Sequence, residues 1–186
     1  MRVNTLPWLL PLLAGGTLIA VLACRPFGRL LDAPWWAAFI LLEGLAVVIA
    51  VTLTPQRNNA LALDPFAVVP EAGAEPLVRP PWQWWPIDDR TLNVLILVPV
   101  GFAVMWVGRT LVRRVLIVIA LLLPLFVEST QHVLTWLDRD SQWQDVADNT
   151  TGVLLGLGLG WLMLRVGRAR NRARRVRSAD GPLTDA

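Results

Sequence analysis

The feature that most constrains this chain is a series of five apolar runs separated by polar or proline-rich connections. A bilayer has a hydrocarbon core about 30 Å thick, which an α-helix crosses with about 20 residues. A helix satisfies all of its backbone hydrogen bonds within its own segment, as hydrocarbon requires. The predicted spans are residues 6–24, 35–53, 91–107, 115–134 and 150–166. The sequence therefore predicts an all-α integral membrane bundle of about five transmembrane helices.

Composition excludes several other classes of protein. Of the 186 residues, 55% are hydrophobic, and the mean hydropathy of +0.52 is typical of a membrane protein rather than a soluble enzyme. The single cysteine, Cys24, excludes a disulfide framework within the chain. His132 is the single histidine, which argues against a zinc site of the usual His/Cys kind. We expect no bound metal and no cofactor.

The arginines indicate how the helices are oriented, because basic residues accumulate on the cytoplasmic side of a membrane. With the N-terminus outside and the C-terminus in the cytoplasm, most arginines fall inside, including those of the tail RVGRARNRARRVR. The motif VLAC at 21–24 would suit a lipoprotein signal. Cleavage there would put the basic tail outside, so we favour the uncleaved topology.

Four segments follow from this topology. Residues 1–54 hold two N-terminal transmembrane helices, 55–90 form an extracytoplasmic loop rich in Pro and Trp, 91–166 form a three-helix core, and 167–186 are a basic cytoplasmic tail. The loop motif WQWW at 82–85 would rest on the membrane surface, or it would stack on a sugar or close over a cleft. The tail should attract anionic lipid. Nucleic acid is not expected, because no folded module or aromatic interleaving accompanies the charge.

Polar residues occur at one predicted depth in the last three spans, near the outer leaflet. Glu128 and Gln131 are three residues apart and share a helix face, as do Asp145 and Asn149, which are four apart. Asn93 begins the third span at the same depth. Ionisable residues in such places are costly and point to a function by default. The face of Asp145 and Asn149 continues through small residues that allow close helix contact, namely Gly152, Gly156 and Gly160.

These residue types leave several interpretations open. A hydrogen-bonded network of this kind would fix helix register, with Arg139 or Arg90 available to pair with Glu128. Glu128 and Asp145 could also act as an acid–base pair or hold a divalent ion through oxygen atoms. Ser129 and His132 lie close together on one helix, but the sequence places no distinct acid in reach to orient the histidine as the base of a nucleophilic serine. Glu43, within the second span, would be internally hydrogen-bonded or part of a proton pathway.

Three motifs resemble, in order, the pattern of the VanZ-like family of bacterial membrane proteins: DDRTLNVLILVPVGF, LPLFVESTQ and DRDSQWQDVADNTTGVLLG. The matching positions are Asn93, Pro99, Gly101 and Phe102, then Glu128 and Gln131, then Arg139, Asp145, Asn149, Gly152 and Gly156. This chain reads LVP where the family often has a phenylalanine before the proline, and it carries Ser129 and Thr130 where aliphatic residues are commoner. The resemblance implies a multi-pass protein of the bacterial cytoplasmic membrane. Through the founding member, it also implies a link with reduced susceptibility to teicoplanin.

We therefore predict a VanZ-like envelope protein that binds or reorganises a ligand at the outer leaflet without covalent chemistry. The predicted functional cluster is Asn93, Glu128, Gln131, Arg139, Asp145 and Asn149, and the predicted packing positions are Pro99, Gly101, Gly152, Gly156 and Gly160. Expected partners are membrane lipid and a lipid-linked cell-wall precursor or a glycopeptide. Copies of the chain could also assemble through the glycine stripe, unless one chain fills it. The alternatives are an intramembrane enzyme acting on a lipid-linked or phosphorylated substrate, and a small transporter subunit using Glu43 and Glu128.

Overall fold

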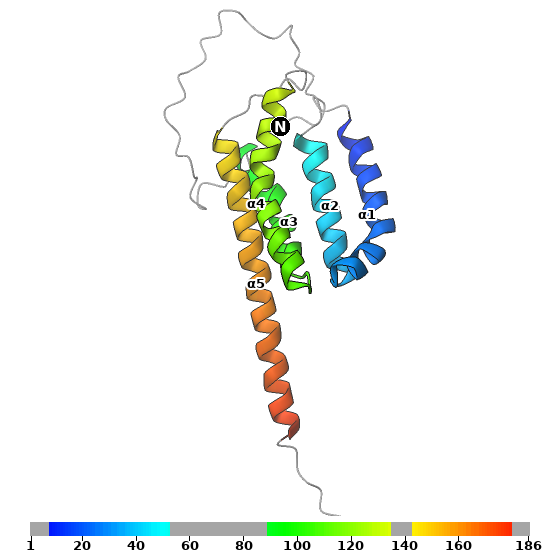
Figure 1. The fold of residues 1–186 in the computed structure, drawn as a ribbon, viewed down its shortest axis with the longest axis vertical. Helices are drawn as coiled ribbons and strands as arrows, with labels where there is room; N and C mark the ends of the chain where they lie inside the picture. The colour runs from blue at the N-terminus through cyan, green and yellow to red at the C-terminus, as the bar shows by residue number, and fades with distance from the viewer. Residues whose placement is uncertain (1–7, 53–88, 135–142, 180–186) are drawn as a thin grey trace, which may run out of the picture.

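The computed structural model describes residues 8–52, 89–134 and 143–179, and this part of the chain is helical with no strand (Figure 1). The helices are α1 (Leu9–Leu31), α2 (Trp35–Thr52), α3 (Asp89–Val104), α4 (Thr110–Val133) and α5 (Trp143–Ala179). They lie side by side as a bundle, and α5 extends well beyond the others (Figure 1). The all-α prediction is confirmed.

Within the described ranges, three helices are long and apolar enough to cross a membrane: α1, α4 and the Trp143–Arg172 part of α5. α2 and α3 are shorter apolar helices. At 1.5 Å per residue, the 16 residues of α3 span about 24 Å, slightly less than a hydrocarbon core. Three backbone bonds, from the amides of Met105, Trp106 and Val107 to the carbonyls three residues earlier, add a tighter turn after Val104. The predicted third span therefore ends in this turn.

Three helices are longer than the spans predicted for them, because α4 begins at Thr110 and α1 and α5 are also extended. α1 continues to Leu31, although Pro26 lies inside it, and ends at Asp32 in the left-handed conformation with φ 53°. The amide of Ala33 then donates to the carbonyl of Gly28 at 2.8 Å, which closes the helix end. α5 begins before its predicted span and continues through the basic segment as far as Ala179. Hydropathy locates the membrane crossing, whereas arginine and alanine allow the helix to continue into water.

The α1–α2 turn packs against the α3–α4 turn. The amide of Gly108 donates to the carbonyl of Asp32 at 2.9 Å, and a Cβ at position 108 would collide with the Asp32 side chain. Beside this contact the rings of Trp36 and Trp106 meet edge to face, with centroids 4.6 Å apart. We call this the turn end of the bundle. The polar end is the opposite one, where α3 and α5 begin and α4 finishes (Figure 1).

α3 and α5 form the most extensive helix contact and run in the same direction. Glycines of α5 meet the backbone of α3 at regular intervals, so an added Cβ would strike it. The pairs, each 58 residues apart, are Gly152 with Val94, Gly156 with Val98 and Gly160 with Phe102. Gly101 makes the reciprocal contact with the backbone of Val153. The glycine stripe is thus filled within one chain.

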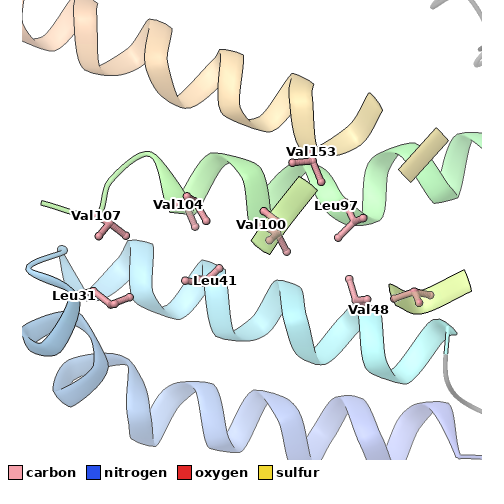
Figure 2. Packing of buried hydrophobic residues seen from close by; sticks show 11 residues of the cluster. Leu31, Leu41, Val48, Leu97, Val100, Val104, Val107 and Val153 are labelled. Carbon is pink, nitrogen blue, oxygen red and sulfur yellow. The ribbon is translucent and has the colours of Figure 1, made fainter. Parts of the chain in front are cut away.

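The hydrophobic core lies around α3. Figure 2 shows Leu41 and Val48 of α2 facing Leu97, Val100 and Val104 of α3. Pro99 and Val100 also lie beside Gly44 of α2. Large apolar side chains cover the outer surfaces of α1, α4 and α5, which a bilayer would solvate.

Candidate functional site

The first element of the polar end is an ion pair between α3 and α5. Arg90 donates through Nε and Nη2 to the two carboxylate oxygens of Asp148, at 2.7 and 3.0 Å. The Asp148 side chain is 2% exposed and that of Arg90 is 13% exposed. A buried carboxylate is tolerated when a guanidinium neutralises it with two parallel hydrogen bonds. The pair therefore joins the first turns of two parallel helices.

A second side-chain pair joins the same two helices and crosses the first. Asn93 Nδ2 donates to Asp145 Oδ1 at 2.7 Å. Arg90 and Asn93 are three apart on α3, and Asp145 and Asp148 are three apart on α5, so the two pairs use one face of each helix. Asn149 is buried beside them, and its Oδ1 has no hydrogen-bond partner within the described part of the chain. We call these five side chains the α3–α5 network.

α4 brings two further polar residues to the same end. Glu128 and Gln131 are 5% and 6% exposed, and both belong to the buried face of the last turns of α4. Pro124 and Val127 share this buried face one turn earlier. The α4 sequence thus turns one polar pair inward, whereas Ser129 and His132 are exposed.

The structure brings five of the six predicted cluster residues to the polar end: Asn93, Glu128, Gln131, Asp145 and Asn149. The sixth, Arg139, lies outside the described residues, as does the WQWW motif. Sequence reasoning did not include Arg90 or Asp148 in the cluster. Their signal was present in the matched three-residue spacings of Arg90 with Asn93 and of Asp145 with Asp148.

A groove of about 370 Å³ opens at this end between α4 and α5. It contains one acidic residue, two further polar side chains, one indole and three aliphatic residues. These are Glu128, Ser129, His132, Trp143, Leu125, Val133 and Val146. Asp145 and Asp148 do not line it, because Asn93 and Arg90 engage them on the α3 side of α5. Among the described residues, no three His, Cys, Asp or Glu side chains gather as a metal site would need.

Glu43 lies away from this groove, between α1 and α2. Its Oε1 accepts a hydrogen bond from the Thr17 hydroxyl at 2.9 Å, which supplies the partner that sequence alone did not identify. Glu43 Oε2 is buried without a hydrogen-bond partner among the described residues.

An all-helical bundle whose apolar helices are long enough to cross a membrane indicates a membrane protein. A family model described as VanZ/LLP1 matches residues 35–164, which include α2, α3, α4 and the apolar part of α5. The chain belongs to the VanZ/LLP1 family. The match covers the α3–α5 network and the whole groove. Searches of curated proteins and of solved structures gave no match.

Proposed function

We propose that this VanZ-like protein is a multi-pass protein of the bacterial cytoplasmic membrane that lowers susceptibility to glycopeptide antibiotics such as teicoplanin. In this proposal the N-terminus is outside, the C-terminus is cytoplasmic, and the polar end faces the outer leaflet. The distribution of described arginines supports the orientation, because Arg90 alone among them lies at the polar end and is neutralised there by Asp148. The arginines toward the other end include Arg25, Arg29, Arg109, Arg113, Arg114, Arg165 and Arg168.

The observation that carries the proposal is that the α3–α5 network and Glu128 have different surroundings at the polar end. The α3–α5 network has its carboxylates engaged by Arg90 and Asn93, so it supports the fold of the site. Glu128 lines a groove wide enough for part of a ligand. A groove with one carboxylate favours binding over two-carboxylate chemistry, which would need Asp145 to face the same space as Glu128.

The test is the glycopeptide susceptibility of a sensitive bacterium that expresses wild type, Glu128→Gln or Asp145→Asn, with the membrane abundance of each measured. We expect wild type to protect and Glu128→Gln to lose protection at equal abundance, whereas Asp145→Asn, which lies outside the groove and keeps an oxygen that can accept from Asn93, should retain it. Glu43→Gln is the matched control, because it changes a carboxylate far from the groove in the same way.

Each other outcome has a definite meaning. If wild type does not protect, the antibiotic link is wrong for this chain. If Glu43→Gln removes protection as completely as Glu128→Gln, a transport pathway through both carboxylates replaces the binding proposal. If Glu128→Gln and Asp145→Asn only lower the protein level, the polar end has a structural role.

A further inference from the structure

The groove between α4 and α5 has a polar wall and an apolar wall. Glu128, Ser129 and His132 come from the last turns of α4, and Glu128 and His132 share a face because they are four residues apart. Leu125 and Val146 supply apolar surface from the two helices. Such a surface suits a molecule that is itself part polar and part apolar.

The polar wall is chemically suited to hydroxyl groups. A carboxylate accepts hydrogen bonds, a serine hydroxyl donates and accepts, and a neutral imidazole does one of each. Among the described residues the groove lining contains no arginine, and Glu128 supplies a carboxylate, so these side chains offer a phosphate no permanent positive partner. A neutral headgroup with several hydroxyls can pair with all three side chains.

Trp143 adds an aromatic surface at the mouth of the groove. It is the first residue of α5, and it is 74% exposed, so most of its indole ring is free to contact a ligand. An indole combines a large apolar face with one hydrogen-bond donor, which suits it to the boundary between lipid and water. The apolar face of a sugar ring can pack on this surface while its hydroxyls reach α4.

The surface of α4 beside the groove continues as an apolar strip. Leu122, Leu125 and Phe126 are all exposed, and they follow the helix from the groove toward the middle of the bundle. A hydrocarbon chain can lie along this strip as lipid does on any apolar helix face. The groove and the strip together have the polarity of a lipid with its headgroup at the polar end.

We propose that this groove binds the sugar headgroup of a membrane glycolipid, with Glu128 accepting from its hydroxyls and Trp143 packing on a sugar ring. The inference rests on the proposed function in placing the polar end at the outer leaflet, and it names the ligand class of that site. A groove of about 370 Å³ falls within the range of about 300–1,000 Å³ usual for small-molecule sites.

The test uses the full-length chain in nanodiscs of phosphatidylcholine. Each disc preparation contains the same small fraction of diglucosyl diacylglycerol, phosphatidylethanolamine or phosphatidylglycerol, with identical acyl chains. Native mass spectrometry counts the lipid molecules that stay bound when the protein is released. We expect retention of the diglucosyl lipid above the other two.

Two substitutions assign this retention to the groove. Glu128→Gln should weaken it about tenfold, because a charged acceptor is lost, and Trp143→Leu about fivefold. Trp161→Leu is the matched control, since Trp161 is an exposed indole of α5 that lies outside the groove and should retain the lipid as wild type does. Trp143 is exposed, so its substitution keeps the test valid if Glu128→Gln fails to fold.

Equal retention of all three lipids, or equal loss with Trp143→Leu and Trp161→Leu, would overturn the proposal. Preference for phosphatidylethanolamine would also overturn it, because the groove would then select an ammonium group. Groove-dependent retention of the diglucosyl lipid, in a protein that leaves glycopeptide susceptibility unchanged, would refute the proposed function and keep this inference. Glycopeptide protection that depends on Glu128, in a protein that does not retain the glycolipid, would refute this inference and keep the proposed function.

Discussion

The Arg90–Asp148 pair allows a quantitative prediction about the stability of the bundle. Arg90→Met leaves a carboxylate that is 2% exposed without its two donors, and Asp148→Leu leaves a guanidinium that is 13% exposed. Removing one partner of a buried pair costs about 3–5 kcal/mol. Because Arg90 is more exposed and has a long flexible stem, we expect Asp148→Leu near the lower value and Arg90→Met near the upper one.

The double variant Arg90→Met with Asp148→Leu separates this reasoning from simple loss of packing. Apolar residues of similar size remove both charges together, so the double variant should unfold within about 1 kcal/mol of wild type. The free energy of unfolding is measured on the purified chain in mixed micelles, by titrating a denaturing detergent and following helix content. A double variant that costs the sum of the two single variants would show that the residues are not coupled, and the argument would fail.

Two further predictions concern helix contacts away from this pair. Gly156→Ala should destabilise the bundle by about 1–3 kcal/mol in the same assay, because its Cβ would strike the α3 backbone. Gly158→Ala is the control and should be neutral or slightly stabilising, because nothing lies within 4 Å of its Cβ. Equal effects of the two variants would contradict the close approach of α3 and α5. Thr17→Val should lower the free energy of unfolding by about 0.6 kcal/mol, because it removes the hydrogen bond to Glu43. Thr151→Val is the control and should leave the α1–α2 contact unchanged, because the Thr151 hydroxyl bonds only to Ala147 of its own helix. An unchanged free energy of unfolding for Thr17→Val would mean that the hydrogen bond is not stabilising.

Apolar runs predict the helices well, because a transmembrane helix depends on its own composition more than on its neighbours. They do not predict where a helix ends outside hydrocarbon, so the extension of α1 to Leu31 was missed. The close contact at Gly152 and Gly156 could be anticipated as a small-residue stripe, but its partner could not. Which helix packs against these glycines depends on how the helices are rotated about their axes, and hydropathy carries no information about that rotation.

The same limit explains the incomplete prediction of the candidate site. Asn93, Glu128, Gln131, Asp145 and Asn149 stood out because they are polar residues in or beside apolar runs. The spacing of residues on α3 and α5 could have suggested Arg90 and Asp148 as well. Pairing them requires knowing that α3 and α5 run in the same direction with a constant separation of 58 residues.

That constant separation sets where the length of this chain can change. The ion pair at the polar end and the contacts of Gly152, Gly156 and Gly160 use this separation, although they span several helical turns. Deleting one residue between Asp148 and Gly160 would turn everything after it by about 100° and break every later contact at once. Among related sequences, insertions and deletions should therefore occur in connecting segments. They should be missing from residues 90–102 of α3 and from the matching residues 148–160 of α5.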